Sequence, residues 1–172
     1  MAAKADEGFQ YVILGNFLHR LTQLYDTYYI IALGDQGYGL AVARRSIVEA
    51  ILYTRLFLRH YDESTAELIY LDSLQATIKR LKVWHRSAKE LESSKEDADR
   101  LLWGIMSRRQ DDIEKAIAVR EALANSAAYA HAHQKLYDQE KKKFKRWSQA
   151  VGAGRGRDQV AAYLGMRYFY EV

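Results

Sequence analysis

The chain of 172 residues contains no cysteine and no proline. Without cysteine it cannot form a disulfide, a thiolate zinc site or a cysteine nucleophile. Histidine and carboxylate side chains must therefore carry any chemistry. Average proline usage of about 5% would place roughly eight or nine prolines in a chain of this length. Their absence favours long, uninterrupted helices.

The chain also lacks a strong excess of either charge and any long apolar run. The 26 basic and 22 acidic residues give a formal net charge of +4, which is too small to predict nucleic-acid binding unless it is concentrated on one face. The apolar run in YVILGNFLHR is too short for a signal sequence or a membrane span. We therefore expect a cytoplasmic protein without membrane contacts, folded as a single domain over residues 1–172.

Apolar residues recur every three or four positions, which indicates amphipathic helices. The spacing predicts helices over residues 8–33, over about 38–60, and from about 62 to the ESSKED segment. The glycines of GDQGYG, which readily adopt positive φ, are expected to end the first helix, and Asp62 or Ser64 can cap the third. Predicted inward-facing residues include Val12, Phe17, Leu52, Leu56, Leu71, Leu74 and Trp84 or His85.

The pattern stays helical from Ser94 to about Trp147, and an unbroken helix of that length would measure on the order of 75 Å. We therefore expect a break near Asn125 and Ser126, with a projecting antiparallel hairpin as the alternative. No segment alternates like a half-buried strand. The predicted class is all-α, an up-down bundle of four or five long helices. Before the break, the residues expected to face inward are Leu101, Ile105, Ile113, Ile117 and Leu123.

A glycine- and arginine-rich loop is predicted over residues 151–157. After it, Asp158 can cap a short helix that Gly165 closes in the left-handed conformation. The final MRYFYEV segment has the composition of a further packed helix. The glycine spacing of the loop matches neither a dinucleotide fingerprint nor a P-loop. Arg155 and Arg157 can contact an anion at the start of the short helix, and a plain linker is the alternative.

Arg55 and His60 have the arginine-to-histidine spacing of a large class of helical ribonucleases. The abundance of arginine makes such pairs common by chance, and Arg80 with His85 forms a second one. Five positions place two side chains about 140° apart on a regular helix, so they converge only at a helix end or a distortion. The pair is a candidate catalytic site, and a solvated arginine beside a helix-end histidine is the alternative.

A metal site is not predicted. None of the five histidines follows a glutamate by three positions, the spacing used by di-iron bundles. His131 and His133 lie two positions apart and would point in different directions on a helix. We expect neither a metal nor another cofactor.

The segment KLYDQEKKKFKRW is the most basic part of the chain and interleaves aromatic residues with cations. If it is helical, Tyr137 and Phe144 share one side with lysines around them, an arrangement that suits phosphate contacts beside base-stacking rings. The alternative is an amphipathic helix with its aromatics packed inward. With the loop that follows, the candidate RNA-binding residues are Lys141, Lys142, Lys143, Lys145, Arg146, Arg155 and Arg157.

Arg45 and Glu49 are four positions apart in the second predicted helix and can pair along one face. Their neighbours look buried, so such a pair would have to be satisfied inside the protein. It is either a structural ion pair or part of a site, and the spacing does not separate these alternatives.

Three segments together resemble an uncharacterised bacterial domain family: ARRSIVEAILYTRLFLRHYDE, AELIYLDSLQATIKRLKVW and KKFKRWSQAVGAGRGRDQVAAYLGMRYFY. That family is grouped with the HEPN (higher eukaryotes and prokaryotes nucleotide-binding) helical bundles, and the resemblance covers most of residues 38–172. Arg45 and Glu49 match the arginine-serine-x-x-glutamate helix of the family. Trp147 and Ser148 match the turn before its last helices.

The resemblance implies a metal-independent ribonuclease or an RNA-binding protein of a bacterial toxin or phage-defence system. Family members continue past the tyrosine-rich segment to one that contains histidine, so we expect a domain that is C-terminally incomplete at Val172. The catalytic candidates are Arg45, Glu49, Arg55 and His60, with a histidine taking the 2′-hydroxyl proton and an arginine stabilising the phosphorane. The alternative is a non-catalytic interaction module that binds a protein partner or forms a homodimer.

Overall fold

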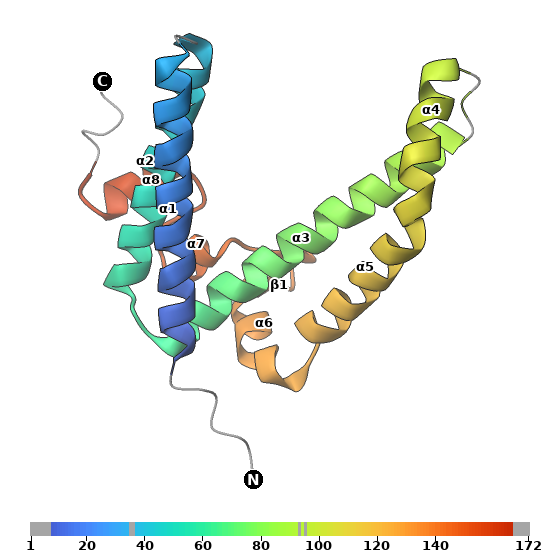
Figure 1. Cartoon of the computed structure of the whole chain (residues 1–172). Helices are drawn as coiled ribbons and strands as arrows, with labels where there is room; N and C mark the ends of the chain where they lie inside the picture. The colour runs from blue at the N-terminus through green and yellow to red at the C-terminus, as the bar shows by residue number, and fades with distance from the viewer. Residues whose placement is uncertain (1–7, 35–36, 93, 95, 167–172) are drawn as a thin grey trace.

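The structure is a computed structural model, and it describes residues 8–34, 37–92, 94 and 96–166. It confirms the all-α class. Helices α1 (Phe9–Leu33), α2 (Gly37–Arg59) and α3 (Glu63–Glu92) lie within a few residues of the three predicted helices. α1 and α2 pack side by side as an antiparallel pair (Figure 1).

The caps of these helices agree only in part with the sequence prediction. Asp62 caps α3 as predicted, because its Oδ1 accepts a hydrogen bond of 2.6 Å from the backbone N–H of Thr65. Gly34 follows the end of α1 with a φ of −85°, so the expected positive φ is absent there. Gly37 and Gly39 lie inside α2. The predicted further helix lies, from Arg167 onward, outside the described residues.

A projecting arm follows from α3. α3 runs diagonally away from the α1–α2 pair, and the chain returns beside it through α4 (Asp97–Met106), the 3-10 turn η1 (Ser107–Arg109) and α5 (Gln110–Ala124), as Figure 1 shows. The predicted break near Asn125 is confirmed, because α5 ends at Ala124. The projecting antiparallel hairpin, given as its alternative, is also present.

The lysine-rich segment is not a continuous helix. After η2 (Ala127–Tyr129) and α6 (Ala130–Leu136), β1 (Tyr137–Asp138) and β2 (Lys143–Phe144) form an antiparallel pair. Asp138 accepts a hydrogen bond from the Lys141 N–H at 3.1 Å, and Lys142 adopts a φ of 47°. The Tyr137 and Phe144 rings contact each other at 5.3 Å between centroids. The predicted helix to Trp147 and the predicted lack of strands were therefore wrong.

The chain ends its described part in α7 (Trp147–Ala150) and α8 (Arg157–Tyr163). The N-cap of α8 is Gly156 and not Asp158, which lies in the first turn. Gln159 supplies the capping contacts instead, since its Oε1 accepts hydrogen bonds from the N–H groups of Arg155 and Gly156 at 2.7 and 3.0 Å. Gly165 has a φ of +70°, as predicted for the residue that closes the helix.

The buried core lies where α2 and the first half of α3 meet α1, α6, α7 and α8. Leu52, Leu56, Leu71 and Leu74 are buried as predicted.

Several predicted core residues are instead exposed, because no described segment covers the outer faces of α1, the far half of α3 and α4–α5. The residues that were predicted to face inward but are exposed are Val12, Trp84, Leu101 and Leu123. Ile105 belongs to the same prediction, but its side chain is outside the described part of the structure.

Among the described residues no helix is long and apolar enough to span a membrane.

Candidate functional site

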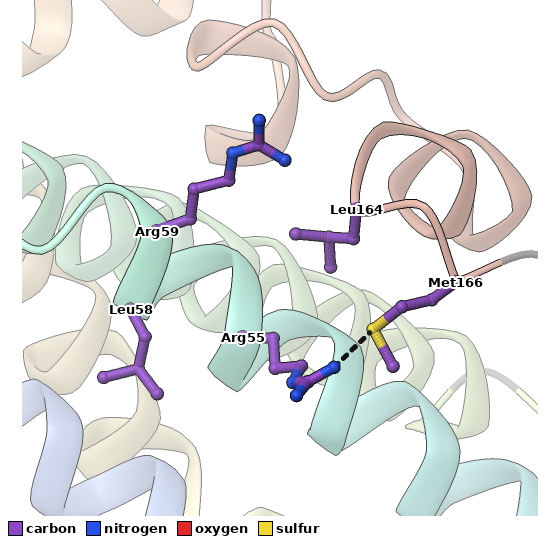
Figure 2. Close-up of a pocket in the computed structure, with 5 residues that line it drawn as sticks. All are labelled: Arg55, Leu58, Arg59, Leu164 and Met166. Carbon is purple, nitrogen blue, oxygen red and sulfur yellow. Dashed lines mark hydrogen bonds between the residues drawn. The ribbon is translucent and has the colours of Figure 1, made fainter.

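An open pocket of about 370 Å³ lies between the end of α2 and the end of α8. The α2 side contributes two arginines four positions apart, which share a helical face. Figure 2 shows these side chains and the segment that follows α8 on the other side of the pocket. The lining residues are Arg55, Leu58, Arg59, Leu164 and Met166.

Both arginines are exposed, and each contacts a residue at or just after the C-terminal end of α8. Arg55 directs Nη1 toward Sδ of Met166 at 3.3 Å. Arg59 donates from Nη1 to the backbone oxygen of Tyr163 at 3.0 Å, and its Cζ lies 4.7 Å from the centroid of the Tyr163 ring. Each guanidinium group has five N–H donors, so most donors remain available to an anion.

His60 lies beside this pocket. Its Nε2 shares a hydrogen bond of 2.9 Å with the Tyr163 hydroxyl, and the two rings stack with centroids 5.8 Å apart. α2 ends at Arg59, so His60 occupies the helix end that the sequence argument required for convergence with Arg55. The two side chains contact different residues of the same segment, Tyr163 and Met166.

The predicted ion pair between Arg45 and Glu49 was wrong. Glu49 lies 3.9 Å from Nη1 of Arg157 instead, and Arg45 is exposed without an ion-pair partner among the described residues. Arg157, a predicted RNA-binding residue, therefore joins α8 to α2. The chain reversal over the loop at residues 151–157 makes this contact, which helical spacing alone does not indicate.

The predicted RNA-binding residues divide into paired and exposed groups. Lys145 pairs with Asp138 at 3.6 Å and Arg146 with Asp72 at 3.8 Å, as Arg157 does with Glu49. The hydrogen bond from the Lys141 N–H holds the pKa of Asp138 below its usual value, and the positive charge of Lys145 lowers this pKa further. The exposed residues whose side chains form no ion pair in the described part of the chain are Lys141, Lys142, Lys143 and Arg155.

A half-buried polar cluster joins α7 to α2 and α3. Asp72 accepts a hydrogen bond of 3.4 Å from the Trp147 N–H, and burial raises the pKa of its carboxyl although Arg146 opposes that shift. Burial, followed by the nearby charge of Glu49, raises the pKa of the Tyr53 hydroxyl. Ser148 donates to the Gly154 oxygen at 2.7 Å. These contacts attach α7 to α3 and to the loop at residues 151–157, so the cluster has a structural role.

Comparison with protein-family models, curated proteins and solved structures found no match for this chain. Within the described residues, no group of three or more histidine, aspartate and glutamate side chains is placed to hold a metal ion. His131 is exposed, and the His133 ring packs against Tyr137 and Phe144.

The residues of the pocket region that sequence reasoning missed include Arg59 and Tyr163. Arg59 had a readable signal, because it follows Arg55 by four positions and therefore shares its helical face. Tyr163 had none, since its contacts with Arg59 and His60 join residues more than 100 positions apart.

Proposed function

We propose that this protein binds RNA and that Arg55 and Arg59 contact the phosphate backbone. The observation that carries the proposal is the pair of exposed guanidinium groups on one open pocket, none of whose described lining residues is acidic. Arginine presents its donors in a planar fork that matches a phosphate group. Phosphate groups of an RNA strand that crosses the pocket between α2 and α8 would therefore find donors on each of the two side chains.

RNA is favoured over other polyanions by the resemblance to HEPN bundles, which also suggests a bacterial toxin or phage-defence setting. The exposed turn of Lys141, Lys142 and Lys143 supports the proposal because unpaired lysines add contacts that do not depend on sequence. Lys141 and Lys142 lie in the β1–β2 turn and Lys143 begins β2, on a separate surface from the pocket.

We expect the double variant Arg55→Ala/Arg59→Ala to bind a fluorescein-labelled single-stranded RNA at least roughly tenfold more weakly, since a hydrogen bond to a charged group contributes about 1.5–3 kcal/mol. Fluorescence anisotropy at low salt measures the dissociation constants. The matched control is Arg108→Ala/Arg109→Ala, which removes the same charge from two exposed, adjacent arginines in the distant turn η1.

Three results would contradict the proposal. One is equal weakening in both double variants, which would show a response to net charge alone. Another is undiminished binding in the pocket variant. The third is the lack of any binding by the unmodified protein at low salt. Circular dichroism shows whether each variant keeps its helices.

A second candidate function, metal-independent RNA cleavage, is favoured by the hydrogen bond between His60 and Tyr163 beside Arg59. In that reaction His60 accepts the proton of a ribose 2′-hydroxyl while the 2′-oxygen attacks phosphorus. The bond from phosphorus to the 5′-oxygen breaks, and water protonates the leaving oxygen. Arg55 and Arg59 stabilise the charge of the phosphorane. The substrate must first displace the Tyr163 hydroxyl from Nε2.

This candidate predicts that end-labelled RNA is cut in the presence of EDTA, and that His60→Ala lowers the rate by roughly 100-fold or more, as loss of a general base does. His85→Ala is the control, because His85 also follows an arginine by five positions but pairs with Glu114 at 3.3 Å in the arm. Gel electrophoresis measures the products. Binding without cleavage would leave RNA binding as the function and exclude this reaction.

A further inference from the structure

The outer face of α1 carries an apolar stripe that the described segments leave largely exposed, with one contact at its start, where the Tyr11 ring lies 6.0 Å from the Tyr61 ring between centroids. Tyr11, Leu18, Tyr25, Tyr29 and Leu33 are between 52% and 72% exposed. With Gly15 and Thr22 between them, their steps of three and four positions keep all seven within about 80° of one helical face. Ile13 and Phe17 pack into the core from another side of the same helix.

This stripe is symmetric about Thr22. Tyr11 and Leu33 lie 11 positions before and after it, and Gly15 and Tyr29 lie seven before and after it. An antiparallel pairing with a second copy, centred on Thr22, places each of these residues opposite the other member of its pair. A two-fold interface requires a patch that is complementary to itself, and the stripe meets that requirement at Thr22 and at these two pairs.

The shapes of the opposed residues also fit. A Cβ atom placed on Gly15 would meet nothing within 4 Å, so this position is open, and the glycine has no side chain to fill the space between Tyr11 and Leu18. Tyr29, which is 59% exposed, is the residue that the second copy brings there. Leu18 and Tyr25 lie four before and three after Thr22, and they face each other across the same interface. The pairing therefore sets a large ring over a gap twice, once from each copy.

The polar side chains beside the stripe fit the same pairing. His19 and Asp26 are exposed, lie three before and four after Thr22, and occupy the same edge of the helix. The second copy therefore brings its Asp26 to the level of His19, and the reverse contact forms at the other end. Among the described residues Asp26 has no ion-pair partner in its own chain, while His19 Nε2 contacts Gln23 at 2.9 Å.

We infer that the protein forms a two-fold homodimer through antiparallel packing of α1 against α1 of a second copy. α1 has 25 residues and a length of about 38 Å, so the contact is one long helix pair. The inference is independent of RNA binding, because the stripe and the arginine pocket share no residue.

Disulfide trapping tests both the dimer and its direction, since the chain has no cysteine of its own. Leu18→Cys and Tyr25→Cys proteins are prepared separately, mixed and oxidised mildly. Antiparallel packing predicts that the mixture crosslinks at least roughly tenfold faster than either protein alone, because only the pair 18 with 25 meets. Faster crosslinking of each protein with itself would indicate parallel packing and overturn the inference.

Sedimentation measures the dimer without crosslinks. We expect the unmodified protein to shift from monomer to dimer with rising concentration, and Tyr25→Glu/Tyr29→Glu to remain a monomer. The control, Val83→Glu/Trp84→Glu, adds the same charge to exposed apolar residues of α3 and should dimerise normally. A monomer at every concentration overturns the inference, as does loss of the dimer only in the α3 variant. Binding of α1 to lipid vesicles by a monomeric protein would identify a different occupant and also overturn it.

Discussion

We expect Phe57→Ala to lower the free energy of unfolding by about 3–5 kcal/mol, the range found when a buried phenylalanine is truncated. Phe57 is fully buried. Its ring contacts Phe17 of α1 at 5.7 Å and Tyr61 at 5.3 Å between centroids. Truncation therefore leaves a cavity at the junction of α1 and α2. Urea denaturation followed by circular dichroism measures the loss.

The adjacent residue provides the control for this variant. Leu58 lies on the same helix but is 49% exposed, so Leu58→Ala should cost less than about 1.5 kcal/mol, well under the value for a buried leucine. Similar losses in the two variants would show that Phe57 is not packed as described. A change in the urea dependence, rather than in the midpoint alone, would point to an altered unfolded state.

Gly154→Ala should be the next most destabilising change, by roughly 2–3 kcal/mol. Gly154 has a φ of +87°, and a Cβ atom there would lie 2.6 Å from Oε1 and 2.7 Å from Cβ of Gln159. The left-handed conformation costs an L-residue about 1–2 kcal/mol. Displacing Gln159 adds to that cost, because its side chain caps α8 through the N–H groups of Arg155 and Gly156.

Gly152→Ala separates the two causes. Gly152 has a similar φ of +83°, but a Cβ atom there would meet nothing within 4 Å. Gly152→Ala should therefore lower the free energy of unfolding only by the cost of the left-handed conformation, about 1–2 kcal/mol. Thermal and urea unfolding of both variants make the comparison. An equal effect of the two substitutions would exclude the clash with Gln159, and no effect of Gly154→Ala would exclude both causes.

Periodicity predicted the long helices because each buries one continuous face. α1, α2 and α3 lie close to their predicted ranges, and Asp62 caps α3 as expected. The same pattern overestimated burial in Leu101, which is 71% exposed. An apolar repeat indicates a face that can pack but does not state whether a partner covers it.

The lysine-rich turn was mispredicted for a different reason. Lysine, glutamate and glutamine all have high helix propensity, and nothing in that segment ends a helix as proline would. The hydrogen bond to Asp138 and the packing of Tyr137 on Phe144 override that local preference. The pocket was partly predictable from Arg55 and His60 on α2, whereas its other wall comes from a distant segment whose position only the folded chain establishes.

The single helix α3 spans two regions of unequal stability. Between Thr65 and Ile78 it is buried against several elements, but beyond Ile78 only Ala88 is buried. The arm is then held by α5, with ion pairs such as Lys82 with Glu121 at 2.6 Å. Because stability is greatest where burial is dense, the outer turns can open as a separate cooperative unit. The boundary between two unfolding units would thus lie within one continuous helix, and opening of the arm would leave the pocket intact.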